Sequence, residues 1–118
     1  MFQDTLKHTL AHIEGARACL LLGFDGIPIA SVFVNKETEG ELVNAVAVEL
    51  SNTFGKLRAT SFGAGGLEEM SLLSGEMAVL ARVVQEEYLL LMALKPGADL
   101  DQGARMLRLI SPWVEQQM

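Results

Sequence analysis

A short apolar run followed by a tight turn limits what this chain can fold into more than any other feature. Ala18–Leu22 is uninterrupted by polar residues, and Asp25-Gly26 follows it closely. A run this short is typical of a strand buried on both faces, and Asp-Gly between apolar segments predicts a hairpin. The returning strand, Ile27–Val34, contains Pro28, which has no N–H to donate, so we expect it at a sheet edge.

The strongest helical pattern spans about Glu41 to Arg58. Its main apolar stripe recurs at steps of three and four residues, as expected for one buried face; it comprises Val43, Val46, Ala47, Leu50, Phe54 and Leu57. Leu42, Ala45 and Val48 lie off this stripe. Because a helix that is apolar on more than one side is covered on more than one side, we expect this helix to contact more than its own sheet.

The other segments complete an alternation of helices and strands. A first amphipathic helix ends before Gly15, and the polar residues 35–40 are interpreted as a connection. Asp99 is expected to cap a last helix, in a capping box with Gln102, and Pro112 to kink or interrupt that helix. Three further strands, joined as antiparallel hairpins, follow a glycine-rich joint at residues 63–66; they are expected at about Leu67–Leu73, Met77–Val84 and Tyr88–Leu94. The predicted class is α+β, in the order α-β-β-α-β-β-β-α.

Length and charge narrow the class of protein. A chain of 118 residues has the size of one domain, residues 1–118. Half of it is apolar, more than so small a domain is expected to bury alone, which suggests association. The net charge is −6, and the nine Lys and Arg residues are scattered, which argues against nucleic-acid binding. The longest apolar run, Tyr88–Leu94, is far shorter than the roughly 20 residues of a membrane span. We therefore expect a cytoplasmic protein without direct membrane insertion.

No pattern predicts catalysis or a bound cofactor. Cys19 lies inside an apolar run and is expected to be a buried, inert thiol. His8 and His12 have a spacing that can hold a metal, but a third ligand is not evident. Glu68 and Glu69 are neighbours on an expected strand and so point to opposite faces, which does not suit acid–base chemistry. The sequence predicts no catalytic, cofactor or metal site, and a protein that is not an enzyme.

Several local strings resemble one family over essentially the whole chain, the Roadblock/dynein light chain family. They are Gly15 before the first strand, Phe24-Asp25-Gly26-Ile27-Pro28-Ile29-Ala30-Ser31 in the hairpin, Glu49-Leu50 in the long helix, Gly75 between the third and fourth strands, and Tyr88–Leu94. The resemblance implies a five-stranded antiparallel sheet flanked by helices, the profilin-like Roadblock fold. No catalytic signature accompanies it.

The resemblance also implies a partner surface. Members of the family pair through the third strand and the second helix, which gives a continuous sheet across a homodimer or a heterodimer. The corresponding dimer interface in this chain comprises Ala45, Val48, Glu49, Asn52, Leu67, Glu68, Glu69, Met70, Ser71, Leu72 and Leu73. The charge of Glu68-Glu69 is at odds with strand pairing, because charged residues usually protect a sheet edge.

Prokaryotic, MglB-like members of the family regulate small Ras-like GTPases, with the paired second helices as the docking platform. The GTPase-facing residues implied here are Glu41, Asn44, Glu49, Asn52, Thr53 and Lys56. We therefore expect a non-enzymatic homodimeric regulator or docking platform for such a GTPase, and the short end after the last helix favours docking over activation. The alternatives are a scaffold or adaptor subunit of a motor or membrane-associated complex without GTPase contact, and a small-molecule sensor, because profilin-like sheets resemble the PAS and GAF folds.

Overall fold

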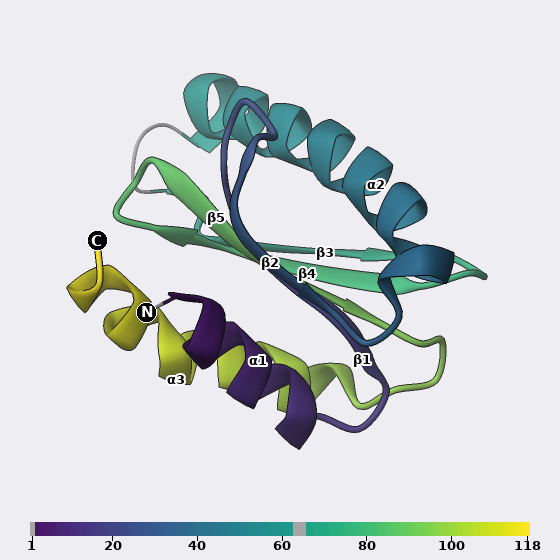
Figure 1. Ribbon diagram of the computed structural model, residues 1–118. Helices are drawn as coiled ribbons and strands as arrows, with labels where there is room; N and C mark the ends of the chain where they lie inside the picture. Colours follow the sequence, from purple (N-terminus) through teal and green to yellow (C-terminus); the bar gives the residue numbers. More distant parts are fainter. Residues whose placement is uncertain (1, 63–65) are drawn as a thin grey trace.

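A computed structural model describes residues 2–62 and 66–118 of the chain, so residues 63–65 of the predicted glycine-rich joint lie outside the described residues. The elements follow the predicted order (Figure 1), with a short π-helical turn, η1, added after the second helix. Their bounds are α1 (Phe2–His12), β1 (Ala16–Gly23), β2 (Pro28–Phe33), α2 (Lys36–Leu57), η1 (Arg58–Phe62), β3 (Glu69–Leu73), β4 (Ala78–Val84), β5 (Tyr88–Leu94) and α3 (Leu100–Gln116).

The strands form one five-stranded sheet in the order β2-β1-β5-β4-β3, and every neighbouring pair is antiparallel. Helix α2 covers one face, and α1 and α3 lie side by side on the other (Figure 1). Strand β2, which contains Pro28, is an edge strand as predicted, and β3 is the opposite edge. The sheet therefore has two edges of different composition.

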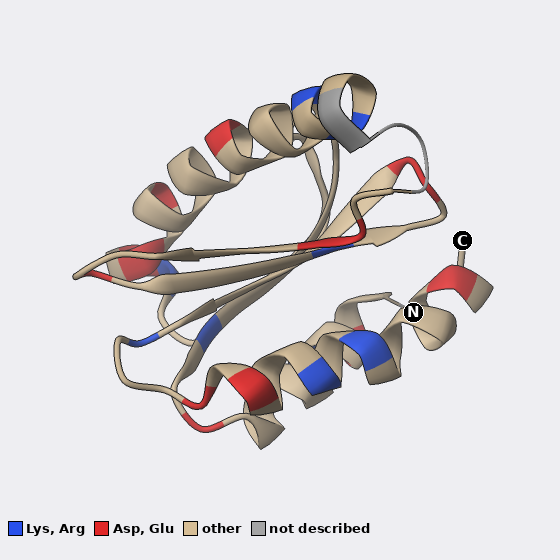
Figure 2. Ribbon diagram, turned by 180° about the vertical axis from the view of Figure 1, so that it is seen from behind, with Lys and Arg blue, Asp and Glu red and all other residues tan. Residues whose placement is uncertain are grey.

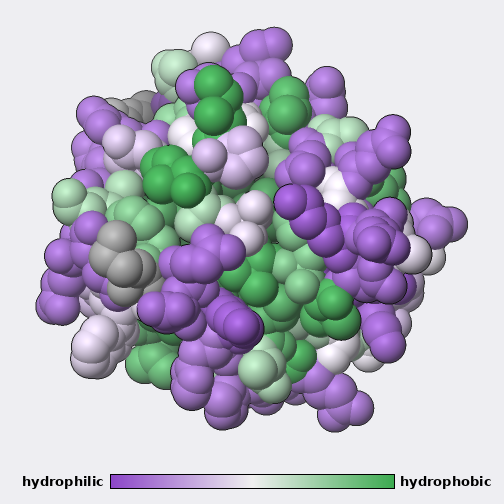
Figure 3. All heavy atoms as spheres, viewed as in Figure 1, coloured by the Kyte–Doolittle hydropathy of each residue, from purple (hydrophilic) through white to green (hydrophobic). Residues whose placement is uncertain are grey.

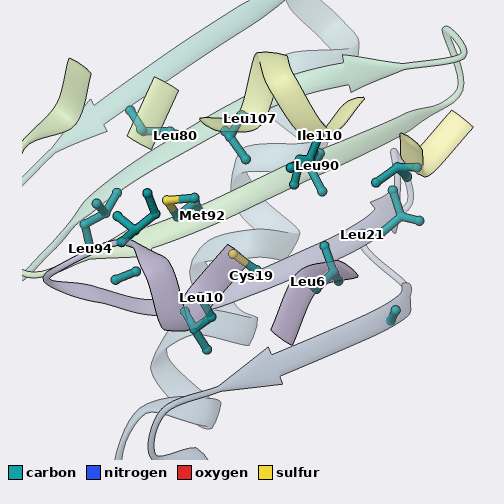
Figure 4. Packing of buried hydrophobic residues seen from close by; sticks show 14 of the residues in the cluster. Leu6, Leu10, Cys19, Leu21, Leu80, Leu90, Met92, Leu94, Leu107 and Ile110 are labelled. Atoms are coloured by element: carbon teal, nitrogen blue, oxygen red, sulfur yellow. The ribbon is translucent and has the colours of Figure 1, made fainter. Parts of the chain in front are cut away.

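The alternation of side chains along β1 divides the core into two layers. Leu20 packs with Phe54 and the rest of the α2 layer. Cys19 and Leu21 point to the other face, toward Leu6 of α1 and residues of α3 (Figure 4). The three β1 residues are fully buried, which confirms the prediction of a strand covered on both sides.

Helix α2 begins earlier than the sequence pattern suggested. Asn35 is its N-cap, and the Asn35 side chain accepts a hydrogen bond from the Thr38 backbone N–H at 3.3 Å. The interpretation of residues 35–40 as a connection was therefore wrong, because the cap satisfies the exposed N–H groups of the first turn. Glu37 and Glu39 lie in that turn, where the helix dipole favours negative charge.

The structure confirms one prediction for α3 and contradicts another. Asp99 caps the helix, and its side chain accepts from the Gln102 backbone N–H at 3.1 Å, as predicted. Pro112 does not interrupt α3, which continues to Gln116. Pro112 itself is exposed, whereas Ser111 and Val114 are buried against the sheet layer, so packing holds the helix through the residue that lacks an N–H.

Candidate interaction surface on β3 and α2

The outer edge of β3 carries backbone groups that no neighbouring strand uses. The Val83 N–H donates to the Glu68 carbonyl oxygen at 2.9 Å, so the polar groups of Glu68 point toward β4. Peptide groups alternate in direction along an antiparallel strand. The N–H and C=O groups that point away from the sheet therefore belong to Glu69, Ser71 and Leu73.

The side chains of β3 also divide between the two faces. Leu72 lies opposite Val79, on the α2 side, and Ser71 lies opposite Leu80, on the α3 side. Leu72 is 42% exposed and Leu73 is 67% exposed. Large apolar side chains exposed on an unpaired edge strand are characteristic of a surface that pairs with another chain.

Glu69 is neutralised by two arginines from other elements. The Arg108 Nε–H donates to Glu69 Oε2 at 2.6 Å, the Arg108 Nη2–H donates to Oε1 at 2.7 Å, and Arg82 Nη1 donates to Oε2 as well. The hydrogen bond from Arg108 is the main cause that holds the pKa of Glu69 below its usual value. The conflict between the acidic pair and strand pairing is therefore removed at Glu69, because its charge is matched within the chain.

A groove lies between α3 and the β3–β4 end of the sheet. Its volume is about 400 Å³, and Glu69 and Arg108 are among the residues that line it. Its apolar lining comes from the sheet and from α3, and it includes Leu80, Leu100, Ala104 and Leu107. The groove is thus continuous with the open edge of β3.

All residues that the sequence assigned to a partner surface on α2 are exposed, namely Glu41, Asn44, Ala45, Val48, Glu49, Asn52, Thr53 and Lys56. The buried side of the helix includes Val43, Ala47, Leu50 and Phe54, which pack on the sheet. The sequence therefore separated the buried stripe from the outer surface correctly. It did not resolve how the outer residues divide between the two flanks.

One flank of α2 faces the β1–β2 hairpin. A Cβ on Gly26 would lie 3.1 Å from both Cα and Cγ2 of Val48, and a Cβ on Gly55 would lie 3.8 Å from the Phe24 side chain. Val48 is thus in contact with the hairpin turn, although it remains 39% exposed. A partner on the hairpin side of α2 would meet Val48.

The opposite flank of α2 contains an apolar residue that the predicted interface omitted. Successive residues of a helix are about 100° apart, which places Leu42, Glu49 and Thr53 across the buried stripe from Val48. Leu42 is 47% exposed. Its position off the main stripe was visible in the sequence, but only the contact between Val48 and Gly26 distinguishes the two flanks.

The other candidates for chemistry do not assemble into a site. The His12 Nδ1–H donates to the His8 carbonyl oxygen at 2.8 Å, which occupies one ring nitrogen within α1. Among residues 2–62 and 66–118, no three His, Cys, Asp or Glu side chains lie close enough to hold a metal ion. Burial raises the pKa of the Cys19 thiol to about 12, so Cys19 is an inert core residue.

Lysine and arginine residues of the described part of the chain come from several elements rather than from one. Lys and Arg segments are spread over both helical layers and the sheet (Figure 2). On the face shown in Figure 3, exposed apolar side chains lie in separate groups among polar ones. The helices within the described residues are all too short or too polar to cross a membrane.

Solved structures of other proteins share this architecture. MglC from Myxococcus xanthus is 24% identical, with 99% of this chain and 98% of that chain covered and a TM-score of 0.79. Gliding protein MglB from Thermus thermophilus is 18% identical, with 96% and 84% covered and a TM-score of 0.80. A Roadblock/LC7 domain from Streptomyces avermitilis is 10% identical, with 95% and 96% covered and a TM-score of 0.70.

The likeness extends to profilin, as the sequence resemblance implied. Profilin IA from Acanthamoeba castellanii is 16% identical, with 99% and 98% of the two chains covered and a TM-score of 0.61. No protein-family model and no curated protein matches the sequence. At these identities the comparisons establish the architecture: the chain has the profilin-like Roadblock fold, as found in MglB, MglC and Roadblock/LC7 domains.

Proposed function

We propose that this protein is a non-enzymatic homodimer that serves as a docking platform for a small Ras-like GTPase. The observation that supports it most directly is the open β3 edge, with exposed Leu72 and Leu73 and an internally neutralised Glu69. An edge of this kind gains main-chain hydrogen bonds and buries apolar area when it pairs with a second strand. We take β3 of another copy as that second strand, as the Roadblock resemblance implies.

The role of the dimer is inferred from the outer surface of α2. If two copies pair along β3, their α2 helices lie on the same face of one continuous sheet. The exposed residues of α2 then form a shared polar surface, which is interrupted by Leu42 and Val48. Mixed apolar and polar surfaces are typical of partner sites that bind and release. The Roadblock resemblance implies a Ras-like GTPase as the partner, and the chain shares its fold with gliding protein MglB.

The dimer is tested by sedimentation of the purified protein and of two matched variants. Leu72→Arg places a charge in the proposed contact and is expected to give a monomer, because burying an unpaired charge strongly destabilises the contact. Leu109→Arg makes the same change at a residue that is 64% exposed on α3, in the other helical layer, and is expected to remain dimeric. A monomeric wild type, or a Leu72→Arg variant that still dimerises, would contradict the dimer.

GTPase docking is tested by calorimetry with the small GTPases encoded near this protein, each loaded with GDP or with a non-hydrolysable GTP analogue. We expect binding in one nucleotide state, and weaker binding by Lys56→Glu, a change at an exposed α2 residue that lies outside the predicted dimer interface and leaves the buried stripe intact. If neither nucleotide state binds and the rate of GTP hydrolysis is unchanged, the GTPase role is wrong. A stable dimer without GTPase binding would favour the structural adaptor.

A further inference from the structure

The geometry points to one register for the pair of β3 strands: Ser71 lies on the two-fold axis, Met70 faces the partner's Leu72, and Glu69 faces the partner's Leu73. We infer this register from the edge itself, and it rests on the proposed homodimer. In this arrangement the partner's Leu73 lies beside Glu69, at the groove between β3 and α3. Each copy thus contributes an apolar side chain to the rim of the other copy's groove.

The backbone groups that β3 leaves free favour this register. Glu69, Ser71 and Leu73 direct their N–H and C=O groups outward, because the carbonyl of Glu68 is bonded to Val83 in β4. With Ser71 on the axis, the two Ser71 residues bond each other, and Glu69 and the partner's Leu73 bond each other, as in the hydrogen-bonded pairs of an antiparallel ladder. Every outward group of the strand is then satisfied.

Shifted registers leave groups of the edge without suitable partners. Residues that face each other across two strands have their side chains on the same face of the sheet. Both α2 helices therefore stay on one face only if one strand slides along the other by an even number of residues. A slide of two residues moves the two-fold axis from Ser71 to Met70 or to Leu72. With Met70 on the axis, Leu73 would face the partner's Leu67, whose carbonyl oxygen already accepts from Arg58 Nη1 at 2.8 Å. With Leu72 on the axis, Glu69 would face Gly75, which lies beyond the end of β3 at Leu73.

Charge also favours the proposed register. A register that places Glu69 opposite the partner's Glu69 would bring like charges together, which destabilises cross-strand pairs. The proposed register separates the two carboxylates by four residues along the strand, about 13 Å at the rise of an antiparallel strand. Arg108 and Arg82 hold each carboxylate on its own side, so Glu69 can lie beside the partner's Leu73 with its charge already matched.

Disulfide trapping distinguishes the registers. Residues of a hydrogen-bonded antiparallel pair have Cα atoms about 5.5 Å apart, within the range that a disulfide spans. A shift of two residues adds about 7 Å along the strand, and the bridge can then no longer form. Each single cysteine variant therefore reports only the register that places that residue on the axis. The native Cys19 does not interfere, because it is fully buried.

The experiment compares Ser71→Cys, Met70→Cys and Leu72→Cys in the full chain after mild oxidation, on non-reducing gels. We expect a covalent dimer as the main species for Ser71→Cys, little for Met70→Cys or Leu72→Cys alone, and a covalent dimer again when the last two are mixed. Leu109→Cys, at an exposed site in the other helical layer, is the control for random collision and is expected to remain monomeric on the gel.

The outcomes separate the register from the proposed homodimer. A wild type that sediments as a dimer, with the bridge formed by Met70→Cys or by Leu72→Cys alone, would overturn the register and leave the homodimer standing. A wild type that sediments as a monomer, with no bridge in any variant, would overturn both.

Discussion

Arg108 donates two hydrogen bonds to the carboxylate of Glu69, from Nε to Oε2 at 2.6 Å and from Nη2 to Oε1 at 2.7 Å. The two residues are 39 positions apart in the sequence, and their contact ties α3 to the edge strand β3. Bidentate pairs between an arginine and a carboxylate fix geometry as well as charge. The contact therefore keeps the edge of the sheet in place relative to the helical layer beneath it.

This contact predicts a pH-dependent contribution to stability. The hydrogen bond from Arg108 lowers the pKa of Glu69 from its ordinary value of 4.5, so the contribution is present above pH 4.5 and is lost as the pH falls through the lowered pKa. Glu69→Gln should reduce the free energy of unfolding at pH 7 by less than about 1 kcal/mol, because the pair lies at the surface, with 55% of the Arg108 side chain and 30% of the Glu69 side chain exposed, and is screened by water.

Urea denaturation between pH 3 and pH 7 measures the difference between Glu69→Gln and the wild type. The difference should shrink as the pH falls below 4.5. Glu68→Gln is the matched control, since the structure shows no ion pair for Glu68 among the described residues. A difference for Glu69→Gln that grows toward low pH would show that the sign is wrong.

The β1–β2 turn predicts that a side chain at Gly26 destabilises the fold, and Gly97 provides a matched comparison. Gly26 and Gly97 both have φ near +85°, where an L side chain is strained by about 1–2 kcal/mol. A Cβ on Gly26 would also lie 3.1 Å from Val48, whereas a Cβ on Gly97 would have no atom within 4 Å.

Gly97→Ala should therefore lose about 1–2 kcal/mol of unfolding free energy, and Gly26→Ala should lose more. Thermal or urea denaturation of the two variants isolates the contact with Val48. Equal losses in the two variants would mean that α2 moves away from a side chain at Gly26 without loss of unfolding free energy.

Two helical glycines predict opposite responses to alanine. A Cβ on Gly103 would lie 2.9 Å from Leu80 Cδ1 and 3.3 Å from Met92 Sδ, and both of these residues are buried. Overpacking typically costs about 1–3 kcal/mol, against a gain of about 1 kcal/mol in helix propensity. Gly103→Ala should thus destabilise the fold by up to about 2 kcal/mol.

Gly40 is the counterpart in α2. A Cβ there would lie 3.3 Å from Lys36 Cγ, in a side chain that can move aside. Gly40→Ala should therefore be neutral or stabilising by up to about 1 kcal/mol. Denaturation midpoints of the two variants give the answer, and a stabilised Gly103→Ala variant would show that α3 can shift away from the sheet.

The burial of the Cys19 thiol predicts that it reacts slowly with thiol reagents. Cys19 is fully buried, and burial raises its pKa to about 12, so almost no thiolate is present at pH 8. A thiol reagent such as DTNB should react with the native protein only as fast as the protein unfolds. The cysteine of Leu109→Cys, at a residue that is 64% exposed and outside the proposed interface, should react within the mixing time, and an equally rapid reaction of Cys19 in the wild type would contradict its burial.

Local patterns predicted the elements that local interactions determine. The run from Ala18 to Leu22 predicted a doubly buried strand, and Pro28 predicted an edge, because each depends on the residue itself and its neighbours. The start of α2 was missed because residues 36–40 are polar, and a helix start depends there on the Asn35 cap rather than on apolar spacing.

The sequence predicted less of the candidate site than of the fold. The exposure of the outer residues of α2 follows from helical spacing, and it was predicted. The neutralisation of Glu69 depends on Arg82 and Arg108, which only the folded chain brings together. The contact of Val48 with Gly26 is likewise a matter of how α2 crosses the sheet, which side-chain periodicity within one helix does not determine.

The two edges of the sheet differ in a way that limits growth. At β2, Pro28 lacks an N–H, and the outward carbonyl of Ser31 accepts from the Gln3 side chain at 2.8 Å. At β3, the outward groups have no such cap among the described residues. In the proposed homodimer the two β3 edges pair with each other, and the two edges left open are β2 strands, each with Pro28 and a capped Ser31 carbonyl. This arrangement favours a closed pair over a ribbon or a fibre that grows by adding further copies.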